Sequence, residues 1–227
     1  MSWEREAENW LRWARTPGHD AYWHYRDSFF DVIVPAPGRL TLEVGSGEGR
    51  VARDLADRGH QVVGVDSSRT LTRHAQKADR RGRYLAAAAE ALPFEDASFD
   101  LVVAYNALMD VEDLKLAIAE AARVLAPGGR LCVSVTHPLA DAGRFAEDDT
   151  FVVEGSYLEP SRFEGTDERN GLVMTWRGWS HPLSAYTEAL EAAGLLLETL
   201  REPAPATVNP RWHRVPMFLQ FRAVKRP

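Results

Sequence analysis

The stretch LTLEVGSGEGRVARDLADRG, residues 40–59, decides the fold. An apolar, strand-like run leads through Glu43 into a loop with glycine at positions 45, 47 and 49, and a helical pattern follows over 51–58. Glycine lets the backbone turn sharply and approach a ligand closely, and the start of the helix presents unpaired N–H groups. Strand, glycine loop and helix in this order are typical of a nucleotide-type site, although the glycines can also serve only as a tight turn.

Around this stretch, strand-like and helical patterns alternate from residue 39 to about residue 136. The strand-like runs lack polar alternation, which is typical of strands covered by helices on both faces of a sheet. Alternating β and α units of this length predict an α/β fold with a parallel, doubly wound sheet. We expect strands at 39–45, 61–66, 83–87, 99–105 and 130–136, and further helices at 70–79 and 114–125, the last one ended by a turn at 127–129.

Three segments flank this alternating core. Apolar residues at helical spacing predict two aromatic-rich helices at 3–15 and 20–33, before the first strand. Residues 137–180 break the pattern with charges, glycines and aromatics, which indicates an inserted cap or loop whose charged tips, 147–149 and 164–171, are solvated. A helix at 183–193 and two strands, at 195–200 and 216–224, complete the chain.

Composition limits the classes of partner. The 227 residues carry 33 acidic and 27 basic side chains, a net charge of −6, which gives no broad attraction to nucleic acid. The single cysteine, Cys132, lies in an apolar run, permits no internal disulfide and suggests a reducing setting. No stretch approaches the ~20 apolar residues of a membrane span, and the charged start is unlike a signal peptide. We therefore expect a cytoplasmic protein that acts on small molecules.

Two residues at or near the glycine loop limit the class of ligand that it can bind. Asp66 ends the second strand, 66 − 45 = 21 residues after Gly45, where a carboxylate can accept both ribose hydroxyls; alternatively it only caps the next helix. Arg50 stands where the dinucleotide pattern G-x-G-x-x-G requires glycine or alanine. An adenosine ligand without a pyrophosphate therefore fits this loop better than NAD.

The loop E-x-G-x-G-x-G at 43–49, the acidic strand tip, ALPFEDASFDLVV at 91–103 and RVLAPGGRL at 123–131 together resemble a class I S-adenosylmethionine-dependent methyltransferase, of the UbiE-like small-molecule branch. The resemblance covers roughly 39–136 and more loosely the tail from 181 to 203. It implies one domain with a Rossmann-like seven-stranded sheet in the order 3-2-1-4-5-7-6, the last strand antiparallel, with N-terminal helices and an insertion after strand 5.

The same resemblance implies the cofactor, S-adenosyl-L-methionine, and its contacts. The acidic residue and backbone of the glycine loop would lie near the methionine part, the carboxylate at 66 on the ribose, and residues 89–92 beside the adenine. Ala88 stands where many relatives place an Asp that bonds the adenine amino group. The implied cofactor-binding residues are Glu43, Gly45, Ser46, Gly47, Gly49, Asp66, Ser67, Ala89, Glu90, Ala91, Tyr105 and Asn106.

A catalytic base is optional, because methyl transfer is an in-line displacement that depends mainly on how the acceptor is held. If a base is used, His137 is the best placed candidate, since it follows the fifth strand at the carboxyl edge of the sheet. His24 and His181 are further candidates. Each can instead be structural, His137 as a loop residue that bonds the backbone and His24 as a solvent-facing one. No motif for a catalytic metal is present.

The sequence thus predicts a methyltransferase for a small aromatic or amphiphilic acceptor. Its parts would be a helical lid at 1–38, a cofactor-binding core at 39–136, an acceptor-binding insertion at 137–180, and the C-terminal helix and strands at 181–227. Two alternatives stay open: a non-catalytic module that binds the adenosyl ligand, and an NAD-dependent oxidoreductase. We expect no nucleic-acid or membrane partner and a monomer or homodimer. Aromatic and Met residues that could line the acceptor pocket are Phe145, Phe151, Tyr157, Phe163, Met174, Trp176 and Trp179.

Overall fold

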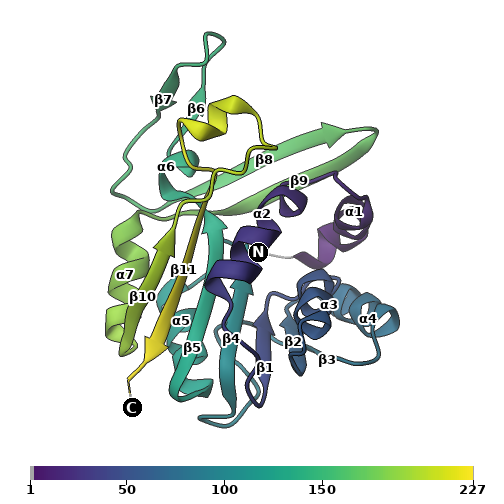
Figure 1. The fold of residues 1–227 in the computed structure, drawn as a ribbon. Helices are drawn as coiled ribbons and strands as arrows, with labels where there is room; N and C mark the ends of the chain where they lie inside the picture. Colours follow the sequence, from purple (N-terminus) through teal and green to yellow (C-terminus); the bar gives the residue numbers. More distant parts are fainter. Residues whose placement is uncertain (1–2, 227) are drawn as a thin grey trace.

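A seven-stranded sheet forms the centre of the molecule in the computed structural model, which describes residues 3–226 (Figure 1). Its strands lie in the order β10-β11-β5-β4-β1-β2-β3, and β11 runs antiparallel to both of its neighbours. Numbered only within this sheet, the order is 3-2-1-4-5-7-6, so the predicted α/β fold is confirmed. The strands are β1 (Thr41–Val44), β2 (Val62–Asp66), β3 (Arg83–Ala86), β4 (Phe99–Tyr105), β5 (Leu125–Thr136), β10 (Leu195–Arg201) and β11 (Phe218–Lys225).

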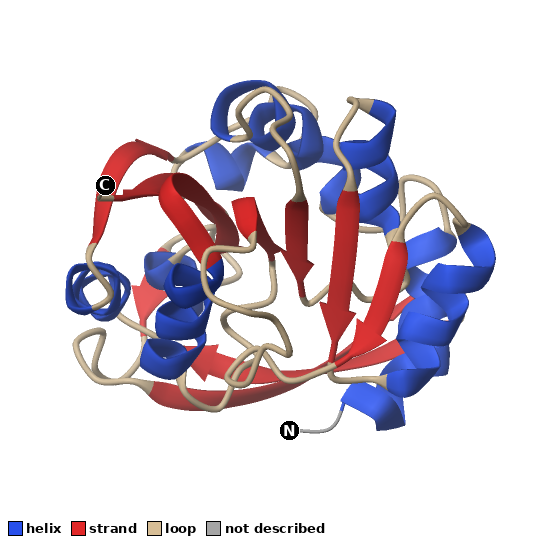
Figure 2. Cartoon of the chain, turned by 90° about the horizontal axis from the view of Figure 1, so that it is seen from below, coloured by secondary structure: helices blue, strands red, loops and turns tan. Residues whose placement is uncertain are grey.

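Helices cover both faces of this sheet (Figure 2). Alternate residues of β4 show the arrangement: Val102 packs in one apolar cluster with α5 and α7, whereas Val103 packs in a second cluster with α2 and α3. Burial on both faces explains why the strands carry no polar alternation. The helices that connect and flank the strands are α3 (Arg50–Asp57), α4 (Arg69–Ala78), α5 (Leu114–Val124) and α7 (Leu183–Ala192), each within one residue of its predicted bounds.

The junction between α5 and β5 differs from the prediction. The turn expected at 127–129 is instead part of β5, which begins at Leu125 directly after the helix. The pairing of β4 with β5 is irregular between Phe99 and Leu101, and Gly128 has a φ of 75°. The pairing passes from Phe99 with Leu125 to Leu101 with Arg130, so residues 126–129, which include both glycines, bulge out of the ladder within the strand.

Two helices precede the sheet, as predicted. The first, α1 (Trp3–Arg15), lies between α4 and the strand β9 of the insertion. The second, α2 (Tyr22–Ser28), changes into a π-helical turn at Phe29–Ile33, whereas one continuous helix was expected. In this turn Phe29 and Ile33 are fully buried and Val32 is exposed, so the turn rotates its apolar residues onto the sheet.

The insertion consists of a short helix, α6 (Pro138–Asp141), and two antiparallel hairpins, β6–β7 and β8–β9. The longer hairpin runs across the top of the sheet towards α1 (Figure 1). The charged segment 164–171 is mostly strand rather than the expected loop, because it pairs with β9, but its side chains are solvent-exposed as expected. The hairpin strands are β6 (Gly143–Phe145), β7 (Phe151–Val153), β8 (Ser161–Arg169) and β9 (Leu172–Ser180).

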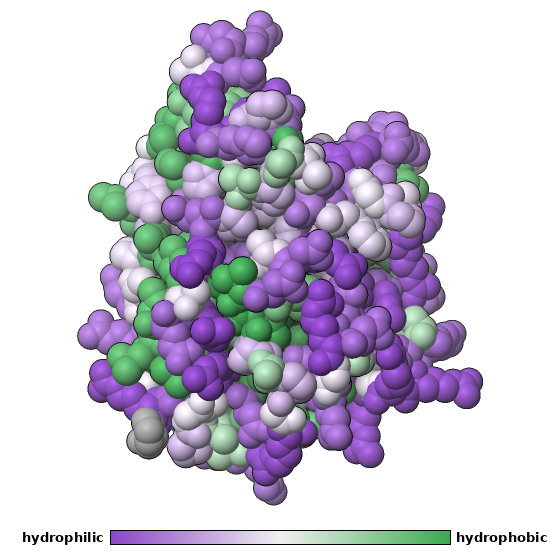
Figure 3. All heavy atoms as spheres, in the orientation of Figure 1, coloured by the Kyte–Doolittle hydropathy of each residue, from purple (hydrophilic) through white to green (hydrophobic). Residues whose placement is uncertain are grey.

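The surface is polar over α3 and α4 and more apolar over β10, where Leu196 and Leu197 are 44% and 45% exposed (Figure 3). Among residues 3–226, no helix is both long and apolar enough to cross a membrane.

Candidate active site

The loop between β1 and α3 is shaped by its glycines. Gly45, Gly47 and Gly49 have φ angles of 72°, 53° and 86°, a region that side chains with a Cβ rarely adopt. A Cβ on Gly45 would lie 2.3 Å from the Cβ of Ala107, in the loop after β4. These positions therefore require glycine both for their backbone conformation and for close packing, as the sequence pattern predicted.

Asp66, at the end of β2, holds this loop in place. One carboxylate oxygen accepts the N–H of Gly47 and the other accepts the N–H of Ser68, both at 2.8 Å. The side chain is nearly buried, and burial raises its pKa although the two N–H bonds oppose the change. Each oxygen retains a lone pair for a further donor such as a ribose hydroxyl. The ribose contact of Asp66 stays a prediction.

Two buried oxygens at the loop have no hydrogen-bond partner within the described residues: Oε2 of Glu43 and Oγ of Ser46. Glu43 is 2% exposed, and burial together with the charges of Asp66 and Glu48 raises its pKa well above the usual range. Buried polar atoms are nearly always paired, so unpaired ones at a glycine loop point to a polar ligand. The ammonium group of a bound methionine moiety would supply the missing donor and favour the charged carboxylate.

Arginines connect the loop to the N-terminal helices. Glu48, almost fully buried, accepts Nε of Arg15 at 2.9 Å and Nη2 of Arg53 at 2.7 Å. Arg50 forms an ion pair with Asp20 at 2.7 Å and lies over the ring of Tyr22, 4.2 Å from its centroid. The Arg50 side chain is therefore held by residues at and just before the start of α2. It occupies the position at which dinucleotide binding requires a small residue.

The first helix lies directly on the glycine loop. Nε1 of Trp10 is 3.1 Å from the position of a Cβ on Gly47. The carboxylate of Glu4 accepts hydrogen bonds from the hydroxyls of Ser68 and Thr70 at the start of α4, which lowers its pKa to about 2. The apolar spacing at 3–15 predicted this helix but does not reveal what its apolar face covers.

Residues 89–92, predicted to border the adenine, follow β3 on the same edge of the sheet. Leu92 donates its N–H to Glu120 at 2.8 Å, and Oε1 of Glu90 accepts the N–H of Glu112 at 2.9 Å. Ala88 and Ala91 are exposed, as is Ser67 after β2. Hydrogen bonds with Glu120 on α5 and with Glu112 just before α5 therefore hold this segment in place. Its adenine contacts stay predictions.

Tyr105 and Asn106 end β4 beside the loop. Asn106 has a φ of 50°, and its Oδ1 accepts the hydroxyl of Ser134 at 2.9 Å, which fixes the turn. The ring of Tyr105 packs against Tyr22 and Phe29, and its hydroxyl has no partner within residues 3–226. Asn106 is therefore a turn residue in this structure, and the methionine contacts of Tyr105 and Asn106 stay predictions.

Two of the three histidines proposed as bases, His137 and His24, have protein partners, whereas the buried Nε2 of His181 has none within the described residues. His137 caps α6, since its Nδ1 accepts the N–H of Leu139 at 3.0 Å, and its Nε2 donates to Glu202 at 2.8 Å. Burial lowers its pKa, and Glu202 opposes this change. His24 is exposed on α2 and contacts Thr207 at 3.0 Å. This geometry matches the structural alternative for both residues, so their catalytic role stays a prediction.

The aromatic residues of the insertion separate into different groups. Trp176 meets Trp3, Trp10 and Trp13 of α1, with ring centroids 5.7–6.4 Å apart. Phe145 and Phe151 instead pack with each other and with Trp212 of the C-terminal connection. Only the first group adjoins the glycine loop, through Trp10.

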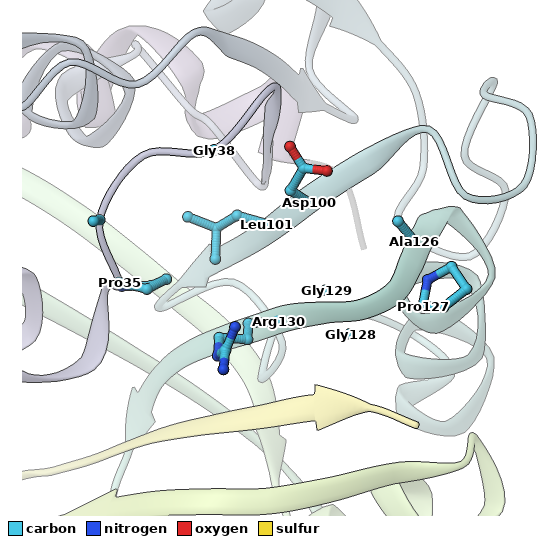
Figure 4. A pocket seen from close by; sticks show the side chains of 10 residues that line it. Pro35, Gly38, Asp100, Leu101, Ala126, Pro127, Gly128, Gly129 and Arg130 are labelled. Carbon is cyan, nitrogen blue, oxygen red and sulfur yellow. The ribbon is translucent and has the colours of Figure 1, made fainter. Parts of the chain in front are cut away.

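A cavity of about 200 Å³ lies at the opposite edge of the sheet, near the amino ends of β4 and β5 (Figure 4). Its one carboxylate, Asp100, already accepts the backbone N–H groups of Arg39 and Leu40. Ligands of doubly wound folds bind at the carboxyl ends of the strands. This cavity is therefore separate from the candidate site.

Comparison with known proteins agrees with this geometry. Residues 42–133 match the methyltransferase domain family. A demethylmenaquinone methyltransferase of Renibacterium salmoninarum is 36% identical over 115 residues, which are 50% of this chain and 48% of that protein. A malonyl-[acyl-carrier protein] O-methyltransferase of Pseudescherichia vulneris is 32% identical over 154 residues, 66% of this chain and 60% of the relative. The chain thus spans about half of the length of these curated relatives, and somewhat more of the second.

The solved structures extend the similarity of fold to most of the chain. A putative S-adenosylmethionine-dependent methyltransferase from Listeria monocytogenes matches with a TM-score of 0.73 at 21% identity, over 90% of this chain and 97% of that one. Residues 42–133 are thus similar to the methyltransferase domain family, and most of the chain shares its fold with a solved S-adenosylmethionine-dependent methyltransferase. Other curated proteins similar to this part of the chain are also demethylmenaquinone methyltransferases, among them one of Thermus thermophilus that is 38% identical over 51% of this chain and 54% of its own length.

Proposed function

We propose that this protein transfers a methyl group from S-adenosylmethionine to a small aromatic or amphiphilic acceptor. The observation that carries the proposal is the pair of buried, unpartnered oxygens of Glu43 and Ser46 beside the glycine loop that Asp66 holds. Glu43 and Ser46 would hold the amino-acid end of the cofactor, Asp66 the ribose, and residues 89–92 the adenine. When bound, the cofactor supplies an electrophilic methyl group.

We further propose that α1 is a lid over the cofactor. Trp10 covers Gly47, Glu4 is bonded to the start of α4, and Glu6 forms an ion pair with Arg177 of β9 at 3.2 Å. These contacts are side-chain contacts of one helix, so the helix can leave without disturbing the sheet. Access of the cofactor to the loop then requires α1 to move.

The acceptor would lie between α1 and the insertion at 137–180, where Trp176 meets the tryptophans of α1. Apolar rings suit a flat or amphiphilic metabolite. The family match ends at residue 133, so nothing in it assigns the acceptor. We also propose a cytoplasmic monomer or homodimer without nucleic-acid or membrane partners. The net charge of −6 supports action on free metabolites rather than on nucleic acid, and the single buried Cys132 supports a reducing setting.

Two measurements on the wild-type chain test the function. Calorimetric titration should show binding of S-adenosylhomocysteine and none of NADH; binding of NADH alone would reinstate an oxidoreductase. Incubation with methyl-labelled S-adenosylmethionine and a deproteinised extract of the producing organism should move label into a metabolite. Binding without any transfer of label would leave a non-catalytic binding module instead.

A further inference from the structure

The segment TPGHD at 16–20, which connects α1 to α2, adjoins buried polar atoms that the glycine-loop site does not use. His19 is 3% exposed, and neither of its ring nitrogens has a hydrogen-bond partner within residues 3–226. Nε1 of Trp13 and Oδ1 of Asp20 are also buried and have no partner there. Four such atoms this close in sequence are unusual, because buried polar groups are nearly always paired.

Direct contacts fix this segment between α1 and the insertion. The ring of His19 meets the ring of Trp13 edge-on, with the centroids 4.4 Å apart. The carbonyl oxygen of His19 accepts a hydrogen bond from Arg169 at the end of β8, whose guanidinium carbon lies 5.8 Å from the centre of the Trp13 ring. An edge-on indole satisfies one ring N–H at most, and only weakly, so at least one nitrogen of His19 lacks a hydrogen bond.

The same segment is connected to the glycine loop through Arg50. Oδ2 of Asp20 pairs with Nη1 of Arg50 at 2.7 Å, whereas the second oxygen of this carboxylate is the unpartnered one. Arg50 begins α3 directly after the glycine loop, and its guanidinium carbon lies 4.9 Å from the ring centre of Trp10. Trp10 in turn lies against Gly47 of that loop. Successive contacts thus join the unpartnered atoms to the loop that would hold the cofactor.

Aromatic rings border the segment on two sides. Trp176 of β9 lies with its ring centroid 5.7 Å from those of Trp13 and Trp10. Tyr22, which begins α2, packs against Tyr105 at the end of β4, with the centroids 5.4 Å apart. The polar atoms therefore adjoin both the tryptophan group assigned to the acceptor and the carboxyl end of β4, where ligands of doubly wound folds bind. Because these atoms are buried, a ligand reaches them only when α1 moves away from β9.

The unpartnered atoms determine which chemical group fits among them. A neutral histidine ring offers one donor and one acceptor, the indole of Trp13 offers a donor, and Oδ1 of Asp20 offers an acceptor. A carboxylate only accepts hydrogen bonds and an ammonium only donates them, so each would leave part of this set unpaired. A hydroxyl or a carboxamide both donates and accepts. The matching ligand group is therefore uncharged.

We propose that His19, Trp13 and Asp20 form the part of the acceptor site that binds an uncharged hydroxyl or carboxamide group of an aromatic acceptor; this rests on the proposed methyltransferase function. Of the three side chains, only His19 supplies both a donor and an acceptor, so it determines specificity for such a group. The tryptophans of α1 and β9 contact the aromatic ring. An acceptor without a matching group is rejected, because these polar atoms stay unpaired when it binds.

The test measures binding of five aromatic probes by NMR titration at millimolar concentration, with saturating S-adenosylhomocysteine present. Phenol and benzamide should bind, and toluene, benzoate and benzylammonium should bind ~10-fold more weakly or not at all. His19→Phe keeps a flat ring without nitrogens, and should weaken phenol and benzamide about 10-fold and leave toluene unchanged. His19→Gln retains a donor and an acceptor and should restore most of the binding. His213→Phe, the same substitution at an exposed histidine, is the control and should match the wild type.

Two further measurements separate ligand binding from a structural role of His19. Because its ring nitrogens are buried without partners, His19→Phe should raise the melting temperature by about 2–4 °C, whereas a histidine bonded within the protein would stabilise the fold and its loss would lower this temperature. In the wild type with isotope-labelled histidine, phenol should shift the ring-nitrogen signals of His19, and toluene should not. These signals are assigned by their absence from the spectrum of His19→Gln.

The outcomes distinguish this inference from the function on which it rests. Phenol that binds no better than toluene, phenol that leaves the His19 signals in place, wild-type phenol binding by His19→Phe, or a lower melting temperature of that variant would each overturn the proposal. Failure of the wild type to bind S-adenosylhomocysteine would instead refute the methyltransferase function itself.

Discussion

The glycine loop and the β8–β9 hairpin of the insertion face the same space but are built differently. The loop is fixed by backbone conformation and by N–H groups bonded to Asp66, next to a β1 that is buried along its whole length. The hairpin has an exposed β8 and contacts the rest of the protein through side chains such as Arg177 and Trp176. The glycine loop depends on its backbone conformation and therefore tolerates few substitutions. The hairpin makes its contacts through side chains, so its residues can differ from one acceptor to another.

The contrast is tested most strongly by one glycine from each region. Gly45→Ala places a Cβ 2.3 Å from Ala107 at a φ of 72°, and should weaken S-adenosylhomocysteine binding by ~100-fold or more in calorimetry. Gly171→Ala, in the β8–β9 turn, has a φ of 74° and no atom within 4 Å of the new Cβ. It should cost about 1 kcal/mol of stability through backbone strain and leave binding unchanged. Equal effects on binding would show that strain alone, and not packing, matters.

A second pair compares two aspartates that each accept a backbone N–H two residues later. Asp66→Ala leaves the N–H groups of Gly47 and Ser68 unpaired and should reduce S-adenosylhomocysteine affinity at least ~10-fold, since each lost buried bond costs about 1–3 kcal/mol. Asp148→Ala removes the bond to Thr150 in the exposed β6–β7 turn and should change nothing in the same titration. Unchanged binding by Asp66→Ala would contradict the assignment of the whole site.

The smallest effect is expected where α1 meets α4. The pKa of Glu4 is lowered to about 2 by the hydrogen bonds of Ser68 and Thr70, so this contact is complete above about pH 4.5 and is lost as pH falls through about 2. Glu4→Gln should speed release of S-adenosylhomocysteine by about 2–5-fold in stopped flow at pH 7. Arg5→Gln, exposed on the same helix, is the control. Identical release rates would argue against α1 as a lid.

Features that depend on residues close together in the sequence were predicted well. The bounds of the predicted helices, except those of the second helix at 20–33, agreed within one residue, and the glycine positions with their positive φ values followed from the loop motif. The bulge at Gly128 and the π-helical turn at Phe29 escaped prediction, because each depends on how the segment pairs or packs against distant residues. The hydrogen bonding of His137 depends on Glu202, a partner 65 residues away, which no spacing reveals.

The sequence by itself determined the sheet, its doubly wound topology and the ligand class, since hydrophobic periodicity and glycine conformation act over a few neighbouring residues. Only the tertiary structure decided that α1 lies on the glycine loop and that the insertion forms hairpins. Those features follow from burial and electrostatic contact between segments far apart in the chain, and these exist only once the chain has folded.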